Sequence, residues 1–196
     1  DLILKAWTTP GPFRWEGKHF HYRAVNPWVL PMQKPHPPIW IPGGTSPETV
    51  VYAAKHRYPY ICLGTPLNLV PGIKELYGKT AAEEGYTPTP DNLGYVAQAF
   101  AADTDAQAYE VGRNFYWQLG GVFSRVPTHW LQPPGYYTPV ALKARRDDLG
   151  RSLVGLNYDR AQEGKRVFTG NPDNLIEKLK EVVDIVNPSY LILWAR

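Results

Sequence analysis

The sequence is poor in the residue types from which covalent and metal-held scaffolds are built. Its 196 residues include one cysteine, Cys62, and one methionine. A single cysteine excludes an intrachain disulfide framework and a cysteine-rich metal site. Cys62 lies in the apolar run 60–63. We therefore predict a buried, unreactive thiol rather than a nucleophile, and a reducing cytoplasm as the compartment.

Long hydrophobic runs and an excess of one charge are also missing. No stretch of about 18 apolar residues predicts a transmembrane helix, and no signal peptide pattern opens the chain, so we expect no membrane association. The net charge is +3 with both signs interspersed. This balance predicts no binding of nucleic acid. Residues 2–7 resemble the last turns of a helix, so we expect further sequence upstream of Asp1.

Proline and the large aromatic residues are plentiful instead. The chain has 20 Pro, 7 Trp and 13 Tyr, concentrated in irregular stretches such as 8–37 and 120–165. Residues 17–22 alternate like a short edge strand. Ordered loops of this kind often carry function, so Trp130, Tyr136 and Tyr137 are candidate substrate-binding residues. Packing within the loop is the alternative interpretation of these three side chains.

The remaining pattern alternates between strands and helices. Strands are predicted at 38–42, 60–63, 95–102 and 190–194. Helices are predicted from Ser46 to about 56–57, over 67–85, from about 103 through Leu119, over 139–149 and over 172–186. Such alternation predicts an α/β fold with parallel strands joined by right-handed crossovers. Four strands alone cannot close a barrel, so the alternatives are an open α/β sheet and half of an eight-stranded barrel.

The turn after the first of these strands is the strongest candidate for a binding site. Gly43 and Gly44 lead directly into a helix, whose free amide groups and dipole attract an anion. Thr45, Ser46 and Thr49 add hydroxyl groups around the same turn. The stretch is neither a Walker loop nor a dinucleotide fingerprint. A well-capped strand-to-helix turn without a ligand is the alternative.

Other chemistries find little support in the sequence. His19 and His21 alternate on the predicted edge strand, but no third ligand has a suitable spacing, so we predict no metal site. No Gly-x-Ser-x-Gly motif is present, and hydrolase chemistry is therefore not indicated.

Several short motifs, taken in order, resemble the bacterial luciferase-like family of flavin-dependent monooxygenases. They are Phe13 with Gly17 and Phe20, the proline-rich run 31–41 ending in Pro37-Pro38-Ile39-Trp40-Ile41, the turn 43–49, the strand-to-helix junction 101–108, and the helix entry 170–175. The resemblance covers most of the chain outside 120–165. Their order and spacing carry the resemblance.

The resemblance implies a (β/α)8 TIM barrel of which residues 1–196 are one partial domain. Strands five to eight are expected here and the first four upstream. It also implies that Gly43, Gly44, Thr45, Ser46 and Thr49 bind the phosphate of FMN. The implied activity uses reduced FMN and O2 to oxygenate a small organic substrate. No residue of the chain matches a catalytic base of the family, so the catalytic residues are unknown.

Three alternatives remain open for the function. The first is an F420-dependent hydride-transfer oxidoreductase of the same superfamily, the second a non-catalytic flavin-binding half-barrel, and the third an unrelated α/β binding protein. As partners we expect an organic substrate, a flavin reductase that supplies reduced FMN, and a homo- or hetero-oligomeric assembly. The chain alone is expected to be inactive.

Overall fold

A computed structural model describes residues 1–125, 130, 135, 138–139 and 158–195. The chain divides into two compact units, residues 1–39 and residues 40–196. Each unit is described by itself below.

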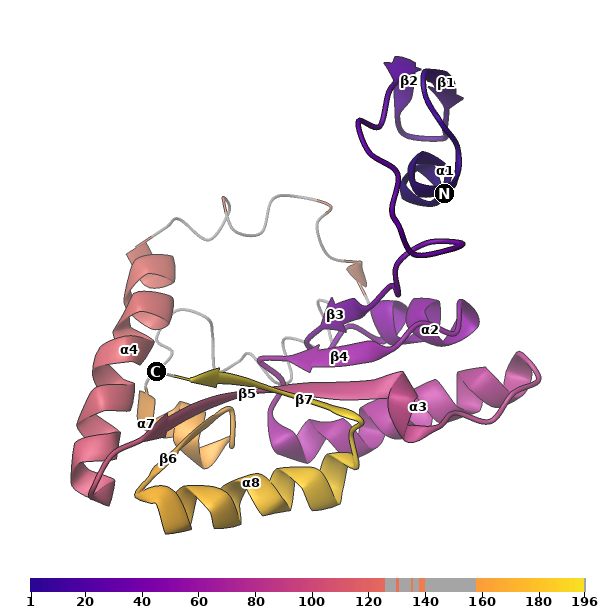
Figure 1. Ribbon diagram of the computed structural model, residues 1–196. Coiled ribbons are helices and arrows are strands. Elements are labelled where there is room, and N and C mark those ends of the chain that lie inside the picture. Colours follow the sequence, from indigo (N-terminus) through magenta and orange to yellow (C-terminus); the bar gives the residue numbers. More distant parts are fainter. Residues whose placement is uncertain (126–129, 131–134, 136–137, 140–157, 196) are drawn as a thin grey trace. The chain divides into compact units, whose positions relative to one another are not determined.

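The first unit consists of one short helix and one hairpin (Figure 1). Helix α1 spans Leu2–Thr8, as the apolar pattern predicts, and strands β1 (Phe13–Glu16) and β2 (His21–Val25) pair antiparallel. The predicted single strand over 17–22 is wrong, because its first half forms the hairpin turn. The amide of Gly17 donates to the carbonyl of Phe20 at 2.9 Å. Alternating side chains alone do not distinguish a strand from a tight turn between two strands.

The second unit alternates strands with helices. In chain order its elements are β3 (Ile41–Gly43), α2 (Pro47–Lys55), β4 (Tyr60–Leu63), the 3-10 turn η1 (Leu67–Leu69), α3 (Val70–Glu83), the 3-10 turn η2 (Pro90–Asn92), β5 (Leu93–Ala101), α4 (Asp105–Arg125), α7 (Tyr158–Glu163), β6 (Val167–Gly170), α8 (Pro172–Val186) and β7 (Tyr190–Ala195). Strand β4 and helix α8 have the predicted bounds. The helix predicted over 139–149 lies, apart from its first residue, outside the described residues.

All strands of this unit are parallel, and the four predicted strands are neighbours in the predicted order β3, β4, β5, β7. The sequence reading missed β6. Residues 94–96 of β5 pair with both β4 and β7, and residues 98–99 pair with both β6 and β7. A strand has two edges, so β4 and β6 follow one another along one edge of β5, and β7 occupies the other. In the described part of the chain the sheet does not close into a barrel, and the outer edges of β3 and β7 have no partner strand.

Two hydrophobic clusters hold the layers together. The larger cluster joins α2, α3 and α8 to one face of the sheet, through strand residues that include Tyr60, Cys62, Tyr95 and Ala97. Successive strand residues face opposite sides. Phe100 therefore points to the other face, where it packs with residues of α4, α7 and β6 in the smaller cluster. That second face also carries apolar side chains that are 38–45% exposed: Leu63, Ile192, Trp194 and Trp40.

Helix ends follow the local sequence. At the start of α8, the side chain of Asn171 accepts a hydrogen bond from the amide of Asn174, and Pro172 occupies the first position. At its end, Asn187 adopts the left-handed conformation with φ 46°. Pro71 falls in the first turn of α3, where its missing N–H has no helical partner in any case. Among the described residues, no helix combines the length and the apolar character needed to cross a bilayer.

Candidate functional site

Gly43, the last residue of β3, and Gly44 directly after it lie at the carboxyl end of the sheet, next to the turn that follows β4. The strands are parallel, with Gly43 opposite Cys62, so their carboxyl ends share one edge. The hydroxyl of Thr65 donates to the carbonyl of Gly44 at 2.9 Å, and that of Tyr60 donates to the same carbonyl at 3.3 Å. Both side chains are buried. The position of the Gly43-Gly44 turn is therefore fixed by hydrogen bonds from β4 and the turn after it.

A buried tyrosine of the central strand β5 holds the turn that contains Thr65 in place. Tyr95 is 1% exposed, and its hydroxyl lies 2.8 Å from the carbonyl of Thr65 and 3.2 Å from that of Lys165. It thereby bridges the turn after β4 and the turn before β6, the two strands that share one edge of β5. The sequence reading missed Tyr60, Thr65 and Tyr95. A threonine directly after the strand-ending Gly64 is the one local signal that marks this position.

The two glycines have different reasons to be glycine. A Cβ atom on Gly43 would lie 2.5 Å from the hydroxyl oxygen of Tyr60, so this position is filled by the packing of β4. A Cβ atom on Gly44 would meet only the carbonyl of Leu63, at an ordinary 3.7 Å. Space beside the backbone is therefore found at Gly44 and not at Gly43. A role of either glycine in phosphate binding stays a prediction.

The predicted donors lie together at the start of α2. Ser46 is the N-cap residue, and its extended backbone (φ −72°, ψ 115°) leads into Pro47. Within the described residues, the amides of Thr45 and Ser46 donate to no protein acceptor, and the hydroxyl of Thr49 has no hydrogen-bond partner. The hydroxyl of Ser46 does not cap the helix but donates to the carboxylate of Glu48 at 2.9 Å.

Glu48 brings a negative charge to the same helix start. Its carboxylate accepts hydrogen bonds from the hydroxyl of Thr138, from its own backbone amide and from Ser46. These bonds, that from Thr138 foremost, hold the pKa of the Glu48 carboxyl below its usual value. The group is therefore ionised at neutral pH and takes one of the donors that the sequence assigned to a phosphate.

The aromatic candidates from 120–165 are only partly described. Trp130 is 71% exposed, while Tyr136 and Tyr137 lie outside the described residues. Thr138, from the same segment, reaches the carboxyl end of the sheet through its bond to Glu48. A substrate role for the three aromatic residues stays a prediction.

His21 contacts a neighbouring carboxylate, and Cys62 is buried. The Nδ1 atom of His21 lies 2.7 Å from a carboxylate oxygen of Glu16 on the neighbouring strand. No three potential metal ligands gather anywhere in the part of the chain that the structure describes. Cys62 is fully buried, as predicted, and burial raises the pKa of its thiol to about 12.

A parallel sheet flanked by helices, with glycine-rich turns at its carboxyl end, places the chain in the α/β class and favours cofactor binding at that end. Comparison with known families is more specific. The profile of the family described as luciferase-like monooxygenase matches residues 1–186. The chain therefore belongs to the luciferase-like monooxygenase family, as its motifs predict.

Solved structures of similar fold include enzymes with two kinds of cofactor. The chain is 20% identical to the monooxygenase RslO1 from Streptomyces bottropensis (TM-score 0.60), covering 97% of this chain and 50% of that one. It is 18% identical to the oxygenating constituent of 3,6-diketocamphane monooxygenase from Pseudomonas putida, a type II Baeyer-Villiger monooxygenase in complex with FMN (TM-score 0.60; 99% and 53% covered). It is 13% identical to an F420-dependent secondary alcohol dehydrogenase in complex with an F420-acetone adduct (TM-score 0.65; 99% and 53% covered). The chain thus spans about half the length of these structures.

Proposed function

We propose that this chain forms the cofactor-phosphate side of an oxidoreductase that uses reduced FMN and O2 to oxygenate a small organic substrate. The observation that carries the proposal is a group of donors at the carboxyl end of the sheet that have no acceptor among the described residues, in a chain of the luciferase-like family. The chain covers about half of its structural relatives, so in this proposal the rest of the barrel lies outside residues 1–196.

The residues present fit a phosphate group in three respects. The amides of Thr45 and Ser46 and the hydroxyl of Thr49 have no acceptor among the described residues. Gly44 leaves the backbone open to close approach, since a Cβ atom there would meet nothing nearer than 3.7 Å. The positive end of the α2 dipole favours an anion.

The carboxylate of Glu48 opposes phosphate binding at this turn, so binding requires the Glu48 side chain to move. A phosphate near Ser46 would meet the ionised carboxylate, and like charges at hydrogen-bonding distance repel. The exposed Glu48 side chain would turn towards solvent and release the Ser46 hydroxyl to the phosphate. In this proposal Tyr60 and Thr65 keep Gly44 in place while the side chain of Glu48 moves.

When bound, reduced FMN would supply the electrons for the activation of O2. The protein residues bind its phosphate, fix its orientation and exclude water. A flavin reductase that delivers reduced FMN and a homo- or hetero-oligomeric assembly belong to this proposal. So does a substrate site near the segment of Trp130, Tyr136 and Tyr137.

A deazaflavin is the second candidate cofactor, favoured by the likeness to the F420-dependent dehydrogenase at TM-score 0.65. F420 also carries a phosphate, so the turn at 43–49 serves either molecule. Parallel titrations with FMN and F420, followed by flavin absorption and deazaflavin fluorescence, separate the two. Preference for FMN over F420 would support the oxygenase, and preference for F420 would support the hydride-transfer enzyme.

Thr49→Val tests the phosphate turn, because it removes the hydroxyl while keeping the shape of the side chain. We expect FMN to bind about tenfold more weakly, the loss of roughly one charge-assisted hydrogen bond. Thr87→Val is the matched control, since Thr87 is exposed and lies outside the turn. Thermal unfolding without cofactor should be unchanged in both variants. Equal FMN affinity of Thr49→Val and the unsubstituted chain would mean that the turn is a strand-to-helix turn without a role in phosphate binding.

A further inference from the structure

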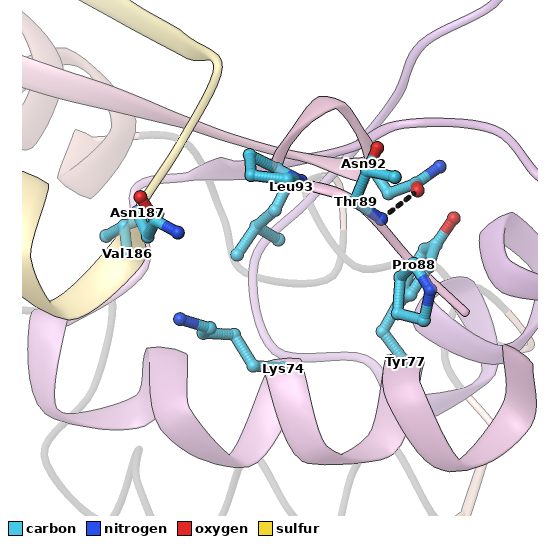
Figure 2. A pocket seen from close by; sticks show the side chains of 9 residues that line it. Lys74, Tyr77, Pro88, Thr89, Asn92, Leu93, Val186 and Asn187 are labelled. Atoms are coloured by element: carbon cyan, nitrogen blue, oxygen red, sulfur yellow. Dashed lines mark hydrogen bonds between the residues drawn. The ribbon is translucent and has the colours of Figure 1, made fainter. Parts of the chain in front are cut away.

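A cavity lies at the opposite end of the sheet from the glycine turn. It has a volume of about 190 Å³ and is lined by residues from α3, the loop before β5, the first residue of β5 and the end of α8 (Figure 2). Leu93 begins β5, and Asn187 directly precedes the loop to β7, so the cavity opens at the amino ends of the strands. It is therefore separate from the turn at 43–49.

The walls of this cavity combine apolar side chains with polar ones. Leu93 and Val186 are 8% and 1% exposed, and they contribute to the main hydrophobic cluster together with Tyr77. Pro88 and Pro90 add rigid apolar surface. Figure 2 shows Tyr77 and Pro88 on one side of the cavity and Val186 with Asn187 on the other.

Lys74 supplies a positive charge to the lining of the cavity. The ammonium group of Lys74 donates to the carbonyl of Ile185 at 3.1 Å, in the last turn of α8, and Figure 2 shows it on the side of Val186 and Asn187. One bond to a carbonyl leaves two of the three donors of an ammonium group. No carboxylate lines the cavity, and within the described residues Lys74 forms no ion pair.

We propose that this cavity binds a small organic carboxylate. The carboxylate would bind Lys74, with the side-chain amide of Asn187 beside it, and the apolar body of the ligand would lie against Leu93, Val186 and Pro88. Polar groups placed beside apolar surface are the usual composition of small-molecule sites. The volume is below the roughly 300–1,000 Å³ typical of larger ligands, so the ligand is small. This site does not depend on the proposed function.

Titration of the ¹⁵N-labelled chain with benzoate, followed by NMR, tests the proposal. We expect saturable shifts for Lys74, Asn187 and Leu93, none for Ser46 and Thr49, and markedly weaker binding of the neutral analogue benzamide. Shifts confined to the glycine turn, equal binding of benzamide, or no saturable shifts would each overturn the proposal.

Two variants then assign the cation. Lys74→Met should weaken benzoate binding about tenfold or more, as expected for the loss of a charge-assisted bond. Lys79→Met, an exposed lysine on the same helix, is the control and should bind as before. Lys74→Gln removes the charge but keeps a donor for Ile185, so it serves if the methionine variant does not fold. Unchanged affinity in either Lys74 variant would contradict the proposal, and the comparison of benzoate with benzamide remains decisive without them.

Discussion

Replacement of Tyr95 by phenylalanine should destabilise the fold and loosen the candidate cofactor site at the same time. The ring is retained, so packing in the main cluster changes little and only the hydroxyl is lost. That hydroxyl donates to the carbonyl of Thr65 at 2.8 Å, with the carbonyl of Lys165 at 3.2 Å. A hydroxyl carries one proton, so the shorter contact with the buried Thr65 dominates. A buried carbonyl left without its donor costs about 1–3 kcal/mol, and we expect the free energy of unfolding to fall by this amount.

The assay is urea unfolding followed by circular dichroism, with Tyr52→Phe as the control. Tyr52 lies on α2 and is 48% exposed, so its variant should stay within about 0.5 kcal/mol of the unsubstituted chain. Thr65 in turn holds the carbonyl of Gly44, so Tyr95→Phe should also weaken FMN binding, while Tyr52→Phe should not. A loss of stability no larger than that of the control would refute the account of Tyr95 as the bridge between the two turns.

Three further predictions follow from the site and the packing. Glu48→Gln removes the carboxylate at the start of α2 and should strengthen FMN binding at neutral pH. The control Glu75→Gln, on an exposed part of α3, should leave FMN binding unchanged. Weaker FMN binding by Glu48→Gln would show that Glu48 does not oppose the phosphate. Cys62 should resist thiol reagents in the native chain and react after unfolding. Burial raises the pKa of its thiol, so the unfolded thiol loses its proton at lower pH than the folded one. The free energy of unfolding should therefore fall as pH rises from about 9 towards 12. Gly78→Ala in α3, where a Cβ atom meets nothing within 4 Å, should raise the melting temperature through a gain of up to about 1 kcal/mol. The same change at Gly112 in α4 would place Cβ 2.1 Å from the hydroxyl of the buried Tyr158 and should lower the melting temperature. The overpacking costs about 1–3 kcal/mol of stability, which outweighs the gain in helix propensity of up to about 1 kcal/mol.

The strands and helices that the sequence predicted well are those with both a strong apolar pattern and clear end signals. Helix α8 has an asparagine cap, a proline in its first turn and a left-handed asparagine after its end, and its bounds were predicted correctly. Strand β6 (Val167–Gly170) was missed because it directly follows a long irregular segment, which hides where the short apolar run begins. The hairpin of β1 and β2 was read as one strand because the period of two continues through the turn.

The candidate site was predictable only in part. The local sequence indicates the glycines, the hydroxyl groups and the helix start, since all of them lie within a few residues of one another. Tyr60 and Thr65 come from β4 and the turn after it, and no local pattern states that both donate to the carbonyl of Gly44. The bond from Tyr95 on β5 to the carbonyl of Thr65 is equally invisible in the local sequence. The contact of Ser46 with Glu48 depends on a side-chain rotamer, which the order of residues does not determine.

The two-sided pairing of β5 has a consequence for how the sheet forms in time. One edge of β5 pairs with β4, which is nearby in the chain, but the other edge pairs with β7, roughly a hundred residues later. Pairing between distant segments slows folding, because a long loop must close before the contact forms. During synthesis on the ribosome, β5 emerges well before β7 and its free edge waits for that partner. Yield should therefore respond to translation speed and to chaperones that cover exposed strands. A variant that weakens β7 should aggregate during expression rather than merely melt at a lower temperature.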